Sequence, residues 1–313
     1  MCNRGIAFTD AHASSALSTP SRYSILTGRY NWRSEKKGGV LGVMSPPMIA
    51  PGRKTIADMF RACDYTTAII GKWHLGWDWT GKDGKPAKRI DDIDFTKRVA
   101  NGPTDKGFDY FYGLTSPSGP PHLYLVNDMA EKQPNMVFED SGGGLYKIKG
   151  GVGHSDWSAE SMQPHLADKT LEYLDENKDS DKPFFLYMAL TAPHIPLFPS
   201  PEFKGKSKIG DYGDLVMMID DIVGRINQKL KEIGKYDDTI VMFAADNGCA
   251  GYINMGQINK KGHYPSYIYR GYKSHGWEGG HRIPFILSWG DRYSRRTDNS
   301  LVSLTDLYAT FAD

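Results

Sequence analysis

The sequence predicts an α/β fold with a largely parallel sheet, because short apolar stretches alternate with longer stretches of helical periodicity. Residues 184–190 and 239–245 are apolar runs of strand length. Between them, Leu215, Ile219 and Ile222 recur at the spacing of one helical face. Helices that connect short apolar strands are typical of a parallel sheet covered on both faces.

Each expected element rests on a local pattern. Thr55 and Asp58 form a capping-box pattern that opens a helix, and Pro164 places the start of a later helix within a turn or two of itself. We therefore expect helices at 55–60, 158–174 and 215–230, the last ending towards Gly234, and strands at 65–70, 184–190, 239–245 and 283–289. The segment 78–153 is rich in Gly, Pro and Lys, and we expect a long loop-bearing insertion over the sheet edge.

Composition excludes several classes of function. Lys plus Arg (38) nearly balances Asp plus Glu (37), so no overall field attracts nucleic acid. No apolar run approaches the roughly 20 residues that a membrane span needs. The three cysteines show no paired spacing, which disfavours a disulfide framework or a zinc site. Of these, Cys249 alone has a catalytic interpretation, and a small residue in a tight loop is the better one.

Charged and polar side chains follow three of the expected strands. Lys72 and His74 follow the first, His194 the second, and Asp246 with Asn247 the third. Ligands of open α/β sheets bind beyond the carboxyl ends of the strands. The sequence therefore predicts that these residues lie at one edge of the sheet.

The segment from Ser18 to Arg22 predicts a helix start. Thr19 can cap, Pro20 suits the first helical position, and Gly28 suits the exit. The amino end of a helix attracts anions, and Arg22, one turn in, adds donors suited to phosphate or sulfate oxygens. An ordinary capped helix with a solvated Arg22 is the alternative interpretation.

Several motifs together resemble the sulfatase family. Ser18-Thr19-Pro20-Ser21-Arg22 followed by Leu26-Thr27-Gly28-Arg29 is similar to the family signature, in which Cys or Ser opens the motif. Further blocks agree in order and spacing: 8–11, 71–76, 107–109, 192–196, 246–248, 277–284 and 304–307. The resemblance spans nearly the whole chain. It implies one catalytic domain over residues 1–313, with the alkaline-phosphatase-like three-layer α/β/α sandwich and its mostly parallel central sheet.

The resemblance also implies a modified nucleophile. In the family, the first motif residue, here Ser18, is oxidised to formylglycine by a separate maturation enzyme. The aldehyde hydrate supplies the attacking oxygen, and its second hydroxyl later expels sulfate. Serine in place of cysteine indicates the bacterial maturation system. Arg22 would hold the formylglycine and its metal environment in place.

Other roles follow in the same way. The resemblance gives sulfate binding to Lys72 and Lys273, assistance of the formylglycine to His74, and protonation of the leaving alkoxide to His194. Imidazole and ammonium groups suit these tasks. His275, two residues after Lys273, is a further substrate-binding prediction, against the ordinary interpretation of a surface or packing histidine.

The resemblance also implies a calcium site. Asp246, Asn247 and the group derived from Ser18 would bind the ion, since calcium prefers oxygen ligands. A type I′ or Asx turn is the alternative interpretation of Asp246-Asn247-Gly248.

The sequence departs from the family pattern at both ends. Sulfatases begin with a strand that ends in adjacent aspartates, and this sequence starts after that place; it also stops before the smaller C-terminal subdomain. We therefore expect a chain that lacks both, with weak calcium affinity and little activity alone. A periplasmic or secreted full-length protein would carry its signal upstream of Met1.

The predicted activity is hydrolysis of a sulfate monoester, on a sulfated carbohydrate or an aryl sulfate, with calcium and formylglycine. Two alternatives remain at this point. One is a phosphatase or phosphonate hydrolase of the same superfamily, and the other is a non-catalytic remnant that binds a glycan. Conversion of Ser18 to formylglycine separates the sulfatase from the first alternative.

Overall fold

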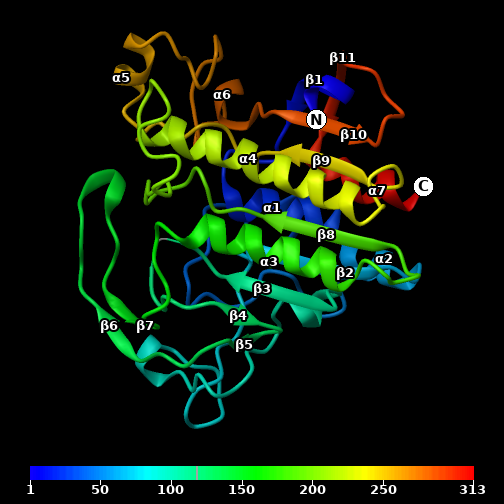
Figure 1. Ribbon diagram of the computed structural model, residues 1–313. Helices are drawn as coiled ribbons and strands as arrows, with labels where there is room; N and C mark the ends of the chain where they lie inside the picture. The colour runs from blue at the N-terminus through cyan, green and yellow to red at the C-terminus, as the bar shows by residue number, and fades with distance from the viewer. Residues whose placement is uncertain (118) are drawn as a thin grey trace. The chain divides into compact units, whose positions relative to one another are not determined.

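The computed structural model describes residues 1–117 and 119–313 (Figure 1). Their contacts divide the chain into two compact units. The first unit comprises Met1–Val40, Leu171–Ser180 and Val223–Asp313, and the second comprises Leu41–Thr170 and Asp181–Ile222. Each unit has its own main β-sheet, so the two are described separately.

The sheet of the first unit has four strands, in the order β11-β1-β10-β9. These are β1 (Gly5–His12), β9 (Ile240–Ala244), β10 (Phe285–Trp289) and β11 (Arg296–Ser303). Figure 1 shows β1, β10 and β11 side by side. The β1–β11 pair is parallel, whereas β10 is antiparallel to both of its neighbours. One apolar core cluster of the first unit comprises Ala11, Ala13, Ile283, Phe285 and Leu304.

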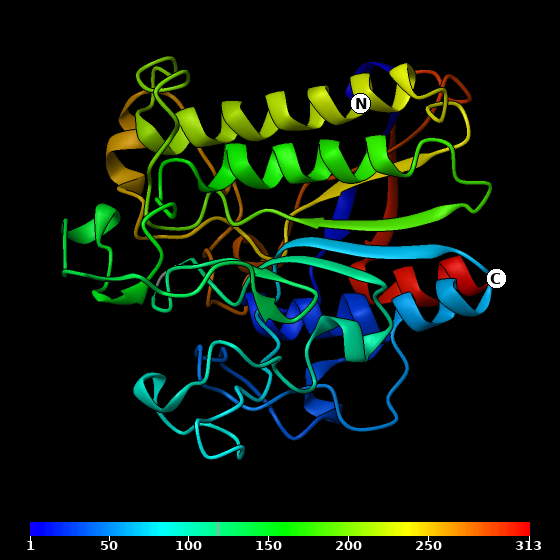
Figure 2. The same ribbon diagram turned by 60° about the horizontal axis from the view of Figure 1, so that its bottom comes forward.

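The main sheet of the second unit has five strands, in the order β5-β4-β3-β2-β8. These are β2 (Thr66–Lys72), β3 (Tyr110–Leu114), β4 (Leu125–Val126), β5 (Met129–Ala130) and β8 (Phe184–Ala189). Strand β2 is buried after its first residue and lies between β3 and β8, parallel to both (Figure 2). A near-continuous apolar run is expected for such a strand.

One antiparallel pair of the second unit, β4–β5, is joined by a tight hairpin. Asn127 and Asp128 join β4 to β5, and both have positive φ angles of 47° and 68°. A two-residue type I′ turn requires that conformation, and Asn and Asp tolerate it better than other side chains. The strands on both sides of this turn are therefore antiparallel.

The helices include four at positions expected from the sequence. They are α1 (Ser18–Thr27), α2 (Ile56–Ala62) with a Thr55–Asp58 capping box, α3 (Met162–Glu176) with Pro164 in its first turn, and α4 (Asp211–Glu232). The structure also has α5 (Met255–Lys260), α6 (Glu278–His281) and α7 (Leu307–Ala312). The remaining elements are a hairpin of β6 (Met136–Phe138) and β7 (Gly151–Gly153) and 3-10 helices at Cys2–Arg4, Asn31–Arg33, Ile90–Asp92, Pro103–Lys106, Gly144–Tyr146 and Leu304–Asp306.

The prediction of an α/β protein is confirmed, but that of a mostly parallel sheet is wrong. Both main sheets are mixed. Hydrophobic runs locate strands without giving their direction, which depends on where each connection returns to the sheet. The 78–153 segment also supplies β3, which lies inside the sheet of the second unit, so it is more than a loop-bearing insertion. Strands β1 and β11 had no counterpart in the sequence prediction.

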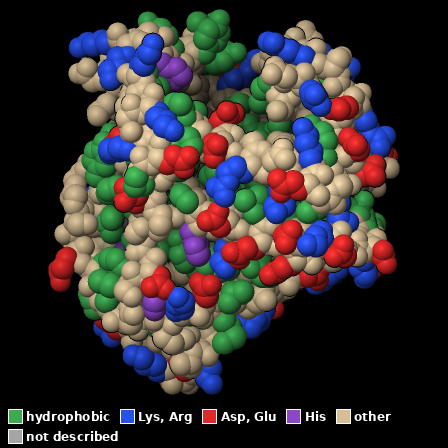
Figure 3. All heavy atoms as spheres, viewed as in Figure 1, with side chains coloured by type: hydrophobic (Ala, Val, Ile, Leu, Met, Phe, Trp, Pro, Cys, Tyr) green, Lys and Arg blue, Asp and Glu red, His purple; other side chains and the backbone are tan. Residues whose placement is uncertain are grey.

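Charge and hydropathy agree with the composition. The face drawn in Figure 3 mixes Lys and Arg with Asp and Glu side chains, as a net charge of +1 would suggest. Among the described residues, no helix combines the length and apolar character needed to cross a membrane.

Candidate active site

Ser18 begins helix α1 and is held by two charged groups of the first unit. Its hydroxyl donates to Asp246 Oδ2 at 2.5 Å, and Arg22 Nε donates to Ser18 Oγ at 2.9 Å. Ser18 and Arg22 are four residues apart on the same helix, so their side chains share one face. Arg22 Nε also lies 2.9 Å from Asp246 Oδ2, which closes a triangle of three polar groups. The structure thus brings together three of the predicted site residues.

The start of α1 differs from the sequence prediction by two residues. Ser18 is already helical and Leu17 is the N-cap, so Thr19 does not cap and Pro20 is the third helical residue. A leucine side chain cannot accept a hydrogen bond, and no side-chain cap hydrogen bond forms at this end. The predicted exit is confirmed, because Gly28 is the C-cap with φ 62°.

The interpretation of Arg22 as a solvated residue is wrong. Its side chain is 7% exposed and that of Asp246 is 21% exposed. A guanidinium removed from water needs a paired charge, which Asp246 provides. Asp246 follows β9 by two residues, at the carboxyl end of the strand, as predicted.

Asn247 carries a polar atom with the properties of a metal ligand. Its Oδ1 is buried and has no hydrogen-bond partner within the described parts of the chain, while its Nδ2 donates to Gly248 O at 3.0 Å. Burying a carbonyl oxygen without a partner is unfavourable. Neither Asn247 nor Gly248 has a positive φ, which rules out a type I′ turn here. The Asp246 carboxylate and the Asn247 oxygen therefore fit a hard cation such as calcium.

Lys273 lies within electrostatic range of the same cluster. Burial lowers the pKa of its ammonium group, and Arg22 acts in the same direction, whereas Asp246 opposes the shift. Its backbone N–H donates to Cys249 O at 2.8 Å, which fixes the loop after Asn247. A partly desolvated lysine beside Arg22 makes the cluster attractive to an anion.

Cys249 and His275 lie on the two segments that the hydrogen bond from Lys273 N–H to Cys249 O joins. The His275 ring packs on Tyr272, with 4.2 Å between ring centroids, so a packing role is visible for it. Cys249 is a half-buried cysteine in the loop after Asn247, where the simpler interpretation puts a small residue.

Lys72 and His74 belong to the second unit, at the carboxyl end of β2. Their exposed fractions are 3% and 8%. His74 has φ 58°, a left-handed conformation that costs a non-glycine residue on the order of 1–3 kcal/mol. Its Nε2 lies 3.0 Å from Leu41 O, which orients the ring. Such strain in a buried histidine is typical of functional sites.

His194 also belongs to the second unit, in the segment after β8. Cis peptide bonds precede Pro193 and Pro196 on either side of it. Its Nδ1 lies 2.6 Å from Ile195 O, so the hydrogen on the imidazole is directed by the backbone. The Ile195 carbonyl therefore orients the imidazole ring.

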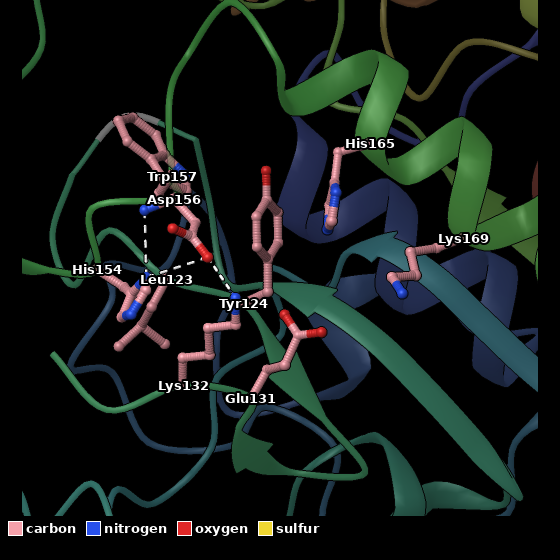
Figure 4. Close-up of a pocket in the computed structure, with 9 residues that line it drawn as sticks. All are labelled: Leu123, Tyr124, Glu131, Lys132, His154, Asp156, Trp157, His165 and Lys169. Atoms are coloured by element: carbon pink, nitrogen blue, oxygen red, sulfur yellow. Dashed lines mark hydrogen bonds and ion pairs between the residues drawn. The ribbon is translucent and has the colours of Figure 1, made fainter.

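The second unit also contains a pocket of about 340 Å³, drawn in Figure 4. It is lined by Leu123, Tyr124, Glu131, Lys132, His154, Asp156, Trp157, His165 and Lys169. None of these lining residues is a predicted site residue. Its walls are joined by ion pairs of Asp156 with Lys132 and His154. The pocket is therefore a separate feature from the predicted chemistry.

Comparison with known proteins identifies the class. The sequence model described as Sulfatase matches residues 1–313. An N-acetylgalactosamine-6-O-sulfatase of Bacteroides thetaiotaomicron is 31% identical, over 100% of this chain and 66% of that protein. A solved structure from work on glycosaminoglycan metabolism by the same organism has a TM-score of 0.84 and 30% identity, covering 99% of this chain and 70% of that one.

A more distant structural likeness concerns the fold alone. The phosphonate monoester hydrolase of Agrobacterium radiobacter has a TM-score of 0.58 and 16% identity, over 100% of this chain and 67% of that chain.

The chain spans about half to two thirds of the length of the curated relatives it matches. With the family model matching its full length, this chain belongs to the sulfatase family, whose members are hydrolases with an alkaline-phosphatase-like fold.

Proposed function

We propose that this chain is the catalytic part of a formylglycine-dependent sulfatase that hydrolyses a sulfate monoester on a sulfated carbohydrate. The observation that carries the proposal is the triangle of Ser18, Arg22 and Asp246 at the start of α1. Ser18, which we propose is converted to formylglycine, lies between the buried Arg22 guanidinium and the Asp246 carboxylate. The names of the relatives, which include an N-acetylgalactosamine-6-O-sulfatase, support an amino-sugar sulfate as the substrate class.

The residues of the first unit provide the charge for this reaction. Arg22 donates to the oxygen of residue 18 and neutralises Asp246. Lys273 adds a positive charge suited to sulfate oxygens, and because burial lowers the pKa of its ammonium group, a bound anion would stabilise the charged form. Removing one such donor typically lowers the rate by roughly 10²–10³-fold. His275 remains a proposed substrate contact.

Asp246 and Asn247 would hold the calcium ion, together with the group on residue 18. The buried, unpartnered Oδ1 of Asn247 supports this assignment. Bound calcium supplies positive charge that favours the ionised nucleophile. Formylglycine, when present, supplies a hydrated aldehyde as nucleophile and a route for releasing sulfate.

The residues of the second unit enter the proposal individually. Lys72 is assigned to sulfate binding, His74 to assistance of the formylglycine and His194 to protonation of the leaving oxygen. The strained backbone of His74 and the directed imidazole of His194 support these roles. Residues 1–313 together form the proposed catalytic domain, and its maturation partner is a formylglycine-generating enzyme.

The proposal is tested by producing the chain with a bacterial serine-type maturation enzyme. We expect the Ser18 peptide to lose two hydrogens by mass, and calcium-dependent sulfate release from a 6-O-sulfated N-acetylgalactosamine substrate that is slower than the release by a full-length relative. Ser18→Ala removes both signals, whereas Ser300→Ala, a change of an exposed serine on β11, retains them. Turnover of a phosphonate monoester by unmodified Ser18 would instead establish the phosphonate hydrolase. Glycan binding with modified Ser18 but no sulfate release would establish a non-catalytic protein.

A further inference from the structure

A second polar cluster in the first unit lies where strand β1 meets helix α6. His12 is the last residue of β1, and Glu278 and His281 are the first and last residues of α6. Three residues apart on a helix, Glu278 and His281 share one face. The backbone N–H of Ala13 donates to His281 O at 2.8 Å, which holds the end of β1 against the helix. The three side chains are half-buried.

The ligand-capable atoms of this cluster converge. One such atom from each side chain lies within 4.8 Å of the others, and the two imidazole rings are 5.2 Å apart at 38°. His12 Nε2 and Glu278 Oε2 are 3.3 Å apart. In tetrahedral zinc sites with bonds of about 2.0–2.2 Å, neighbouring ligand atoms are about 3.4 Å apart. One edge of such a site is therefore already formed.

We propose that His12, Glu278 and His281 bind a divalent transition-metal ion of the zinc type. Two imidazoles and one carboxylate form a donor set that zinc accepts, with a fourth position left for water. Calcium prefers oxygen ligands, so this donor set selects a different ion from the one proposed at Asp246 and Asn247. The site goes beyond the proposed function and does not depend on it.

The surroundings of the cluster suit such a site. His12 Nδ1 is buried, has no hydrogen-bond partner among the described residues, and lies 3.7 Å from Asp10 Oδ1. Histidine ligands of metals usually donate their other ring N–H to a carboxylate or carbonyl, and a small approach of Asp10 would complete that arrangement. Asp10 would then fix the tautomer in which His12 Nε2 faces the metal.

The local charge also favours a cation. Arg282 contacts both Glu278 and Asp10, at 2.9 and 2.8 Å, so two carboxylates face one guanidinium. The Glu278 carboxylate lies between His12 Nε2 at 3.3 Å and Arg282 Nη1 at 2.9 Å. Arg282 also donates to Thr9 O at 2.6 Å, so it keeps a partner when Glu278 turns to a metal.

The cluster is linked to the loops of the first unit. The Gly248 N–H donates to Gly280 O at 2.8 Å, and the Gly279 N–H donates to Arg270 O at 2.9 Å. A side chain at Gly248 would place its Cβ 2.0 Å from Gly279 O, so the turn after Asn247 packs directly on α6. A metal that ties β1 to α6 would therefore also stabilise this turn.

The test is metal binding by the chain after removal of bound metal with a chelator. Co²⁺ is titrated by visible absorption and Zn²⁺ by calorimetry, both in excess Ca²⁺ to fill oxygen sites. We expect one saturable site with the absorption of four-coordinate Co²⁺. His281→Ala should weaken Zn²⁺ binding by more than about tenfold, and Asp10→Asn by roughly 10–100-fold. His263→Ala, a change of an exposed histidine in the same unit, should leave affinity unchanged.

Absence of a saturable Zn²⁺ site, or unchanged affinity in both His12→Ala and His281→Ala, would overturn the proposal. Unfolding of each metal-free variant is followed by circular dichroism. If His281→Ala does not fold, Glu278→Gln replaces it, because it keeps the side-chain shape while removing the charge. The readout is binding and not turnover, so failure of this site and failure of the sulfatase proposal are distinguishable.

Discussion

Two Arg–Asp pairs, one in each unit, are built the opposite way round. In the first unit, Arg22 is the more buried partner, with 7% of its side chain exposed against 21% for Asp246. In the second unit, Asp128 is fully buried and Arg98 is 42% exposed. The N–O distance is 2.9 Å in both. The same ion pair therefore encloses a cation in one place and an anion in the other.

The difference in burial between the two pairs indicates which of them is suited to bind a ligand. Asp128 is bonded at one oxygen by a residue distant in sequence, since Thr104 N and Thr104 Oγ1 both donate to Oδ2, while its buried Oδ1 has no hydrogen-bond partner among the described residues. Burial raises its pKa, so protonation can relieve an unpaired state. Arg22 has no such relief, because a guanidinium stays charged. A buried arginine beside a serine and a partly exposed carboxylate is suited to an anion, whereas the Asp128 pair closes a hairpin.

The largest expected effect comes from removing the partner of each buried charge. Asp246→Asn leaves the Arg22 guanidinium without a counter-charge, and we expect a loss of about 3–5 kcal/mol in the free energy of unfolding. Arg98→Met leaves Asp128, which can take up a proton, so its cost should be smaller, above all at acidic pH. Urea denaturation at two pH values, in a calcium chelator, measures both. If Arg98→Met lost more free energy of unfolding than Asp246→Asn at both pH values, the comparison would be contradicted.

The next effect is calcium-dependent stability. A ligand that binds only the folded state adds about 2.7 kcal/mol when its concentration is 100 times the dissociation constant. We expect calcium to raise the thermal midpoint of the wild type, and Asn247→Ala to lose this rise because the buried Oδ1 is removed. Differential scanning calorimetry with and without calcium measures it. The matched change Asn101→Ala in the second unit should retain the rise, and a retained rise in Asn247→Ala would refute the metal assignment.

A smaller effect is the pH dependence that Asp128 contributes. Its folded-state pKa lies above the ordinary value of 3.8, so the folded protein binds the proton more tightly than the unfolded chain. The contribution to stability is therefore fully present below pH 3.8 and is lost as the pH rises through the folded-state pKa. Asp128→Asn should abolish this slope. Denaturation from acidic to neutral pH tests the sign, and a wild type that gains stability over the variant as the pH rises would contradict it.

The smallest effect is expected at the exposed side of the second pair. Arg98 also contacts Asp105 at 2.7 Å, and both side chains are more than one-third exposed. Exposed pairs contribute about 0–1 kcal/mol and are screened by salt. Asp105→Asn should therefore change the free energy of unfolding by no more than this, with a smaller change at high salt. A loss as large as that of Asp246→Asn would show that exposure does not separate the pairs.

Local patterns in the sequence predicted local structure well. The Thr55–Asp58 capping box, Pro164 near the start of α3 and the apolar face of α4 all correspond to observed helices. The start of α1 was misplaced because Thr19 is a good capping residue locally, yet the chain enters the helix at Leu17. The signature around Ser18 predicted the family, which the comparisons confirm. The individual roles of the site residues remain predictions.

The sequence by itself determined four of the strands, the main helices and the residue types at the candidate site, because these depend on spacing along the chain. Only the tertiary structure decided the direction of β10 and the contact of Ser18 with Asp246, 228 residues apart. The meeting of His12 with Glu278 and His281 was likewise undetectable, since neither histidine matched a motif position with a predicted role. Such contacts depend on how distant segments return to one sheet, and that is set by packing of the whole chain and not by any local pattern.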